Sequence, residues 1–273
     1  MMATIRVDRD LCTRCGICSE VCPSRIIDPA GGADVPEVAE EKEGLCIQCG
    51  HCEAYCPSDA LVLNIRPDEK EMLPSGAGTL SPGDLGYYIK MRRSVRHYTG
   101  EPVSRETITE VLDIARYAPS GCNGQPVEWI VVHDPAKVHE VARLTIDWMR
   151  SIQNRDHPMS GIVHGLISAW DAGHDVICRG APHLLVAHIP EGNQMAVFDA
   201  IIALAHFDLA APAFGIGTCW AGFVAEAVRE YEPLRQELNL PDGRELACAM
   251  MFGHPQYRVH AIPGRKPLEV AWI

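Results

Sequence analysis

The sequence predicts an α+β protein in two parts, a small cysteine-rich domain followed by a larger domain of mixed helices and strands. Three observations predict this organisation. Eight of the twelve cysteines lie within the first 56 residues. The stretch from residue 66 to 83 is rich in proline, glycine, serine and charge without apolar periodicity, which is typical of a linker. Beyond it, apolar residues follow helical spacing in some segments and form short runs in others, without strict alternation. We therefore divide the chain into residues 1–66, a linker at 67–83, and residues 84–273.

The overall composition is that of an ordinary globular protein, with 273 residues of which 47% are hydrophobic and 22% are charged. The formal net charge of −12 disfavours a protein that tracks nucleic-acid phosphates. The N-terminus is charged and has no apolar run, so we expect no signal peptide. The most apolar stretch, residues 195–214, contains Asp199 and Asp208, which favours a buried helix over a membrane span. We therefore expect a cytoplasmic protein that binds neither nucleic acid nor membrane.

The cysteines form two repeats of the spacing C-x2-C-x2-C-x3-C, each followed by proline. A disulfide framework is disfavoured in a chain without a secretory signal. Zinc is an alternative, although zinc ligands come in two pairs rather than in runs of three. Three cysteines separated by two residues each can surround three corners of a cubic cluster, while the fourth reaches the other cluster. The spacing therefore predicts two 4Fe-4S clusters, one held by Cys12, Cys15, Cys18 and Cys56 and the other by Cys46, Cys49, Cys52 and Cys22.

This first part resembles the bacterial two-cluster ferredoxins, from about Ile5 to Ile65. The resemblance implies a pseudo-symmetric pair of strand–helix–strand halves around the metals, with matching strand positions at 26–27 and 61–63. Such a domain is too small for much of a core, so we expect the clusters to supply most of its stability. Residues 1–66 carry 6 Lys+Arg and 11 Asp+Glu, a formal charge of −5, which suits a basic redox partner or simply a solvated acidic face.

Several segments of the second domain have helix caps, helical periodicity or the apolar runs of strands. Ser81 can cap a helix that has Pro82 at its first position. Ser104 caps a clearer helix, whose apolar residues follow the i, i+3, i+4, i+7 pattern until Pro119 stops it. By the same reasoning we expect a helix over 135–152, a partly helical excursion over 153–180, and apolar strands over 127–132, 184–189 and 246–252.

Arginines gather at the end of the first of these helices. Arg92, Arg93 and Arg96 surround the hydroxyl of Ser94 within five residues. A guanidinium group binds phosphate oxygens as a fork, so this segment suits a phosphate, although a solvated basic patch has the same composition.

Two further segments of the second domain are candidates for ligand contacts. The loop over 118–126 lies between two prolines and contains Ser120, Asn123 and Gln125, so its amides can face a heteroaromatic edge; a plain turn is the alternative. The segment over 214–223 has a G-x-G start, but Trp220 stands where a dinucleotide fingerprint requires glycine, so a Rossmann site is excluded.

Together these segments resemble the nitroreductase family of FMN flavoproteins over about residues 80–273, in the order R-x-S-x-R, P-S-x-x-N-x-Q-P and G-x-G-x4-G-F, with Arg-Lys-Pro near the end. The resemblance implies an α/β sandwich and a homodimer with FMN at the subunit interface. It also implies that a loop with Ser120 and Asn123 meets the flavin from the second subunit. Backbone N–H groups of Ala221 and Gly222 would face the flavin N5. The phosphate and ribityl contacts would come from Arg92, Ser94, Arg96 and Arg265.

The two resemblances together predict an FMN-dependent oxidoreductase of the nitroreductase type. Electrons would pass between the two 4Fe-4S clusters and FMN and reduce a small-molecule acceptor such as a nitro compound or a quinone. NAD(P)H or an external low-potential carrier could supply them, and no catalytic acid or base is evident. Alternatives on the same fold are an electron relay to a redox protein partner, flavin fragmentation, and reductive dehalogenation, with the excursion over 143–180 deciding among the reactions.

Overall fold

The chain forms two compact units in the computed structural model, which describes all residues except 1–4, 29–34, 66–68, 74–77 and 79. Unit 1 contains Met1–Thr79 together with Cys122–Gly124, and unit 2 contains Leu80–Gly121 and Gln125–Ile273. The division after Thr79 falls within the stretch that its composition marks as a linker.

The described residues of unit 1 include two small antiparallel strand pairs, two short helices and the 3-10 turn over Glu40–Leu45. Strand β1 pairs with β4, so that Ile5 lies opposite Leu63, and β2 pairs with β3. Each pair therefore joins a strand that precedes one cysteine repeat to a strand that follows the other. The elements are β1 (Ile5–Val7), α1 (Ile17–Glu20), β2 (Ile27–Asp28), β3 (Glu37–Val38), η1 (Glu40–Leu45), α2 (His51–Ala54) and β4 (Leu61–Leu63).

The two cysteine repeats fold in the same way. A glycine in the left-handed conformation precedes each helix, Gly16 with φ 78° before α1 and Gly50 with φ 73° before α2. Only glycine adopts this conformation without steric cost, which explains its place after the second cysteine of each repeat. Equivalent loop residues also have positive φ in both halves: Arg14 and Gln48 before the second cysteine, and Arg25 and Asp59 after each Cys-Pro.

Unit 2 contains a four-stranded sheet in the order β5-β6-β8-β7, with all neighbours antiparallel. The three strands expected from apolar runs are confirmed to within two residues at each end. The fourth, β7, falls inside the glycine-containing segment and was not expected. The strands are β5 (Glu128–Val132), β6 (His183–Pro190), β7 (Gly217–Trp220) and β8 (Arg244–Gly253).

The expected helix starts of unit 2 are confirmed by their caps. The Ser81 hydroxyl accepts a hydrogen bond from the Asp84 N–H at 3.0 Å, and the Ser104 hydroxyl accepts one from the Thr107 N–H at 3.1 Å. These bonds satisfy N–H groups that have no partner within the helix. The helices are α3 (Pro82–Met91), α4 (Arg105–Ala115), α5 (Pro135–Ile152), α6 (Ser160–Asp171), α7 (Gln194–Ala210), α8 (Gly222–Glu230) and α9 (Glu232–Glu237), with 3-10 turns at Gly121–Asn123 and Ala211–Phe214.

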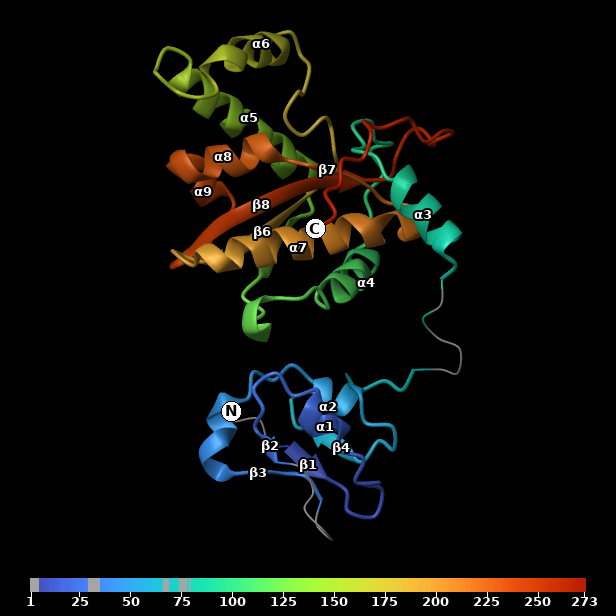
Figure 1. The fold of residues 1–273 in the computed structure, drawn as a ribbon. Coiled ribbons are helices and arrows are strands. Elements are labelled where there is room, and N and C mark those ends of the chain that lie inside the picture. The colour runs from blue at the N-terminus through green and yellow to red at the C-terminus, as the bar shows by residue number, and fades with distance from the viewer. Residues whose placement is uncertain (1–4, 29–34, 66–68, 74–77, 79) are drawn as a thin grey trace. The chain divides into compact units, whose positions relative to one another are not determined.

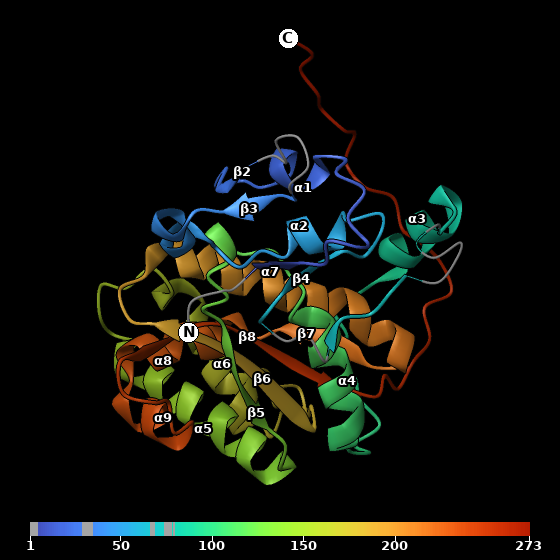
Figure 2. The same cartoon turned by 90° about the horizontal axis from the view of Figure 1, so that it is seen from below.

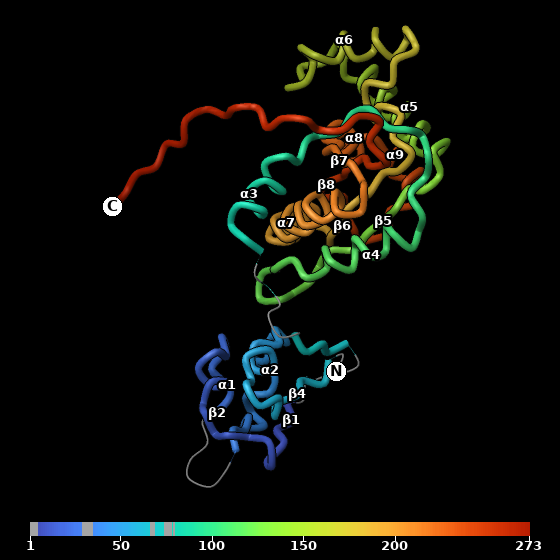
Figure 3. Tube along the Cα trace, turned by 90° about the vertical axis from the view of Figure 1, so that its right-hand side faces the viewer, coloured from blue at the N-terminus to red at the C-terminus, as the bar shows by residue number. Residues whose placement is uncertain are grey.

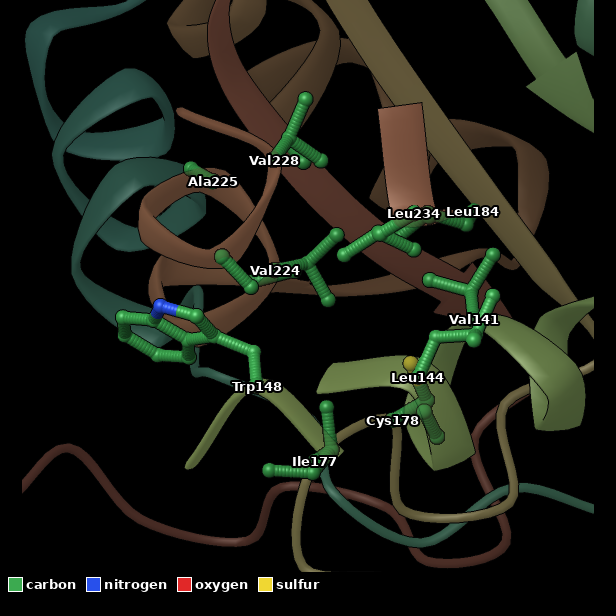
Figure 4. Close-up of a cluster of buried hydrophobic side chains, with 14 of the residues drawn as sticks. Val141, Leu144, Trp148, Ile177, Cys178, Leu184, Val224, Ala225, Val228 and Leu234 are labelled. Atoms are coloured by element: carbon green, nitrogen blue, oxygen red, sulfur yellow. The ribbon is translucent and has the colours of Figure 1, made fainter. Parts of the chain in front are cut away.

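Helices cover both faces of this sheet and bury one apolar core on each face. Figure 1 shows α5, α8 and α9 on one side and α4 and α7 on the other. Successive residues of β6 point to opposite faces, so Leu184 and Val186 pack with α5 and α8, whereas Leu185 and Ala187 pack with α4 and α7. Figure 4 shows part of the first core, in which Leu184 lies beside Leu234 of α9 and Val141 of α5. A sheet buried on both faces explains why its strands are continuous apolar runs.

Helix α7 is less buried than its sequence predicts. It is apolar on nearly all sides, yet Met195, Phe198 and Ile201 are exposed while Leu204 and Phe207 are buried. Within the described residues, the stretch Gln194–Phe214 is the one helix long and apolar enough to cross a membrane by length and composition, a test that core helices also pass. Beyond β8 the C-terminal segment continues without helix or strand, as Figures 2 and 3 show.

Candidate cofactor sites

Two cavities in unit 1 are each lined by four cysteines. Each set takes three cysteines from one repeat and one from the other, which are the sets that the spacing predicts. The first is lined by Cys46, Cys49, Cys52 and Cys22. The second is lined by Cys12, Cys15, Cys18 and Cys56.

The arrangement of the thiols distinguishes between zinc and an iron–sulfur cluster. Zinc would draw four thiolates to about 2.3 Å from a single ion. Among the residues that the structure describes, no three cysteine, histidine or carboxylate side chains converge in that way. Four thiols instead line each cavity, three from one repeat and one from the other, so the donor set fits a 4Fe-4S cluster in each.

The thiols differ in how readily they ionise. Burial raises the pKa of Cys52 to about 12, because the desolvated thiolate is disfavoured. Burial also acts on Cys56, but the N–H of Ala60 donates to its Sγ at 3.3 Å and Ser58 lies at 3.8 Å, and these contacts leave the pKa of Cys56 below its usual value. A bound cluster requires thiolates, so cluster binding at Cys52 would release a proton and offset the desolvation.

In unit 2 the arginine segment lies alongside β7. Ser94 forms a bridge with Thr218, and the Val95 N–H donates to the Thr218 carbonyl oxygen at 2.8 Å. Arg92, directly after α3, places its Nη1 3.4 Å from Oδ2 of the buried Asp208 on α7. The Thr218 hydroxyl donates to the other oxygen of that carboxylate. The Asp208 carboxylate thus ties the Arg92 guanidinium to Thr218 of β7, the residue with which Ser94 forms its bridge, and a guanidinium group binds phosphate oxygens as a fork.

Gly217 allows the arginine segment to approach β7 this closely. A Cβ at this position would lie 2.6 Å from Cγ2 of Val95 and 2.8 Å from Cγ of Pro255. A larger residue would therefore push the segment away from the strand. This close packing, rather than a dinucleotide site, explains why the G-x-G element is present.

The other expected arginines are not all gathered here. Arg96 is exposed, with its Nη1 3.4 Å from the Ser94 carbonyl oxygen. Arg93 turns back and donates to the Lys90 carbonyl oxygen at 3.0 Å. Arg265 lies in the exposed C-terminal segment. Arg92 and Ser94 therefore both lie alongside β7, and the roles of Arg93, Arg96 and Arg265 at a phosphate stay predictions.

The loop over 118–126 is held in an unusual conformation. Three of its non-glycine residues, Cys122, Asn123 and Gln125, have positive φ. The Ser120 hydroxyl accepts a hydrogen bond from the Gln125 N–H at 3.0 Å, which closes the loop. Asn123 belongs to unit 1, whereas Ser120 and Gln125 belong to unit 2. Their role at a flavin stays a prediction.

The expectation for Ala221 requires a correction. Its backbone N–H donates to the Ala249 carbonyl oxygen at 2.8 Å, so this N–H belongs to the sheet and is not free for a ligand. Gly222, which begins α8, is exposed, and no side chain caps the helix there. The first N–H groups of a helix have no partner within it, so Gly222 could still donate to a ligand, and its role at a flavin stays a prediction.

Sequence reasoning missed Asp208 and Thr218 as members of this site. Asp208 carries a signal, because a carboxylate in an otherwise apolar helix must find a partner if it is buried. The identity of that partner, Arg92, follows only from the packing of α3 against α7. Thr218 carries no signal that distinguishes it from other strand residues.

Family models match both parts of the chain. Residues 89–254 match the nitroreductase family, and residues 11–61 match the 4Fe-4S dicluster domain. The chain is 26% identical over 215 residues to 4-nitrobenzoate reductase of Pseudomonas putida, covering 69% of this chain and 92% of that protein. It is 29% identical over 171 residues to FMN reductase [NAD(P)H] of Bacillus subtilis, covering 61% of this chain and 64% of that protein.

The fold agrees with these matches. A nitroreductase with bound FMN from Desulfitobacterium hafniense superposes with a TM-score of 0.54 at 23% identity, over 68% of this chain and 97% of that one. The fold and the site thus define an FMN-dependent oxidoreductase. The chain belongs to the nitroreductase family and carries a 4Fe-4S dicluster ferredoxin domain at its N-terminal end.

Proposed function

We propose that this protein reduces a nitro compound, a quinone or a similar conjugated acceptor, with electrons passing between two 4Fe-4S clusters and FMN. The observation that carries the proposal is the presence of two four-cysteine cavities on the same chain as a nitroreductase-family domain. FMN, when bound, exchanges either single electrons or a hydride, whereas iron–sulfur clusters carry single electrons. One chain that holds both raises the local concentration of the electron carrier.

The residues of unit 2 have distinct tasks in this proposal. Arg92, oriented by Asp208, binds the FMN phosphate together with the Ser94 hydroxyl and Arg96. The free N–H of Gly222 donates to the edge of the flavin ring. The reacting proton comes from solvent, since no acid or base has been assigned to this site.

NAD(P)H is the electron donor that we propose to test first. Support comes from the relative in Bacillus subtilis, whose name specifies NAD(P)H. A low-potential carrier that reduces the clusters is the second candidate, supported by the cysteine cavities themselves.

A homodimer is the assembly that we propose. Its support is the exposed apolar side of α7, with Met195, Phe198 and Ile201. A helix that is apolar on all sides is normally covered, and a second copy of this chain would cover it. Light scattering of the purified flavoprotein gives its mass directly, and a monomer would contradict this assembly.

The decisive experiment is anoxic purification followed by counting of iron, sulfide and FMN per chain. Two 4Fe-4S clusters require about eight iron and eight sulfide, together with one FMN. Zinc in place of iron, or a protein that binds no flavin, would overturn the proposal.

Steady-state assays then separate the reactions. Nitrobenzoate, a quinone and a halogenated phenol are offered with NAD(P)H, and again with reduced viologen as the donor. Reduction of the first two supports the proposal. Turnover of the halogenated phenol alone would indicate dehalogenation instead. Activity only with an added redox protein would favour the relay, for which the acidic character of residues 1–66 is the supporting observation.

A further inference from the structure

Lys70 lies beyond β4, in the stretch whose composition marks it as linker, yet its ammonium group is bound to unit 1. Its Nζ forms ion pairs with Asp59 and with Oε1 of Glu53, the latter at 3.4 Å, and lies 3.4 Å from the Leu61 carbonyl oxygen. The side chains of Lys70 and Glu53 are only 22% and 17% exposed. Solvent therefore screens this ion pair less than an ordinary surface pair.

Both carboxylates are next to cluster ligands. Glu53 directly follows Cys52, which lines the first cavity. Asp59 lies in the loop after Cys56, whose Sγ accepts the N–H of Ala60. Ala60 also lines the second cavity. The two carboxylates thus belong to residues next to Cys52 of the first cavity and in the loop after Cys56 of the second.

The equivalent position in the other repeat has a different charge. Ser19 follows Cys18 as Glu53 follows Cys52, at the third cysteine of each motif. Within the described part of the chain, Ser19 Oγ and Glu53 Oε1 are the buried side-chain oxygens without a hydrogen bond of regular geometry, and the contact of Glu53 Oε1 with Lys70 is the ion pair at 3.4 Å. The two halves therefore match in backbone and in the burial of this oxygen, but one oxygen belongs to a hydroxyl and the other to a carboxylate paired with Lys70.

We propose that Lys70 is a positioning residue that raises the reduction potential of the 4Fe-4S centres by balancing Glu53 and Asp59. Reduction adds one negative charge to a cluster, so an adjacent unpaired carboxylate opposes it and an adjacent ammonium group favours it. The strongest effect is on the cluster held by Cys12, Cys15, Cys18 and Cys56, because Asp59 lies in the loop after Cys56 and Leu61, at the start of β4, lines that cavity. The inference rests on the clusters of the proposed function.

The test is an anoxic redox titration of the full chain, followed by electron paramagnetic resonance. Lys70→Gln should shift at least one cluster midpoint to a more negative potential, whereas Lys70→Arg should retain the wild-type value. Glu53→Gln should shift a midpoint in the positive direction. The double variant Lys70→Gln/Glu53→Gln should return towards the wild type.

Lys42→Gln is the matched control. Lys42 is also paired with one carboxylate of this unit, Asp28, at 2.8 Å, but the two side chains are 36% and 56% exposed. The same change of charge there should shift the midpoints less than Lys70→Gln does. Iron content measured on each variant shows that the clusters are assembled.

The outcomes separate this inference from the proposed function. A wild-type chain without iron–sulfur clusters overturns both. Assembled clusters whose midpoints do not change in Lys70→Gln, or change equally in Lys42→Gln, overturn the role of Lys70 and leave the proposed function intact.

Discussion

The two units of this protein are stabilised in different ways. Unit 2 buries an apolar core on each face of its sheet, with fully buried residues such as Trp148, Leu184 and Phe207. The core cluster of unit 1 contains four buried residues, and all four, Ile26, Ile27, Cys52 and Leu61, also line one of the two cysteine cavities. A unit with so little apolar burial needs another source of stability, and the eight thiols can supply it by binding clusters. The contrast shows that one chain can fold one part by solvent exclusion and another by coordination.

The most severe way to test this contrast is Cys52→Ser. The change removes both a core side chain and a ligand, so we expect loss of at least one cluster and unfolding of unit 1, while unit 2 stays folded. Iron content reports the first effect. Tryptophan fluorescence reports unit 2 separately, because all five tryptophans lie beyond residue 80. Cys122→Ser is the control, since Cys122 is exposed and lines neither cavity; loss of iron in this variant would contradict the assignment of ligands.

The claim that unit 2 is stabilised by its apolar cores is tested by Leu184→Ala. Leu184 is fully buried in the core of Figure 4, and truncation of a buried leucine costs about 2–5 kcal/mol. Chemical denaturation followed by tryptophan fluorescence should show this loss, with iron content unchanged. Ile114→Ala, at a 46% exposed position on α4, should cost much less. Equal losses in the two variants would refute the assignment of Leu184 to the core.

A pH effect is expected in unit 2 at His183. Its Nε2 accepts the Val103 N–H at 2.8 Å and its Nδ1 donates to the His133 carbonyl oxygen at 2.9 Å. Burial, with a further contribution from the nearby rings of His133 and His254, lowers the pKa of His183 to about 4. In the unfolded chain this imidazole binds a proton near pH 6.5. The contribution of neutral His183 to the free energy of unfolding is therefore fully present above that pH and is lost as the pH falls towards 4. The loss should reach up to about 3 kcal/mol.

Denaturation of the wild type between pH 7.5 and 4.5, again followed by tryptophan fluorescence, measures how the free energy of unfolding depends on pH. His183→Gln should show a flatter dependence, whereas His164→Gln, on the exposed side of α6, should retain the wild-type slope. A His183→Gln variant with the unchanged slope would show that another group is responsible.

The flavin site of unit 2 should depend on Arg92. Arg92→Gln leaves Asp208 without its cation and removes a phosphate donor, and charge-assisted hydrogen bonds contribute about 1.5–3 kcal/mol. FMN affinity should therefore fall at least about tenfold in a titration of flavin fluorescence. Arg105→Gln, at the exposed start of α4, should leave affinity unchanged. If FMN binds equally well to both variants, the phosphate lies elsewhere.

The smallest effect is expected for the ion pair between Lys137 on α5 and Glu237 on α9. The Nζ–Oε1 distance is 3.5 Å and the lysine side chain is 58% exposed. Lys137→Gln should change the free energy of unfolding by less than about 0.5 kcal/mol, and the change should shrink further in high salt. A loss above about 1 kcal/mol would show that exposed ion pairs, and not only the apolar cores, contribute substantially to the stability of unit 2.

Much of the local structure follows from short-range patterns. The caps at Ser81 and Ser104 and the helix over 135–152 depend on neighbours within a few residues, and the structure confirms them. Burial was harder to predict. The apolar stretch over 195–214 indicated a buried helix, but part of α7 is exposed, because hydrophobicity by itself does not say which sides meet a neighbour.

The candidate sites likewise combine features that the sequence predicts with features that depend on tertiary packing. The grouping of cysteines into two sets of four could be predicted, because the spacing within each repeat dictates which thiols can share a cluster. The partner of Arg92 could not, since Asp208 is more than a hundred residues away in the chain. The use of the Ala221 N–H by Ala249 could not be predicted either, because it depends on how β8 passes the start of α8.

By itself the sequence determined the two-part organisation, the cysteine sets and the position of the arginine segment, all of which depend on residues close together in the chain or on regular repeats. Tertiary structure alone decided that Asp208 and Thr218 complete the site of Arg92, and that Lys70 binds Glu53 and Asp59. Such pairings arise when separate elements pack, because the cost of burying a charge is offset only by the partner that the fold brings to it.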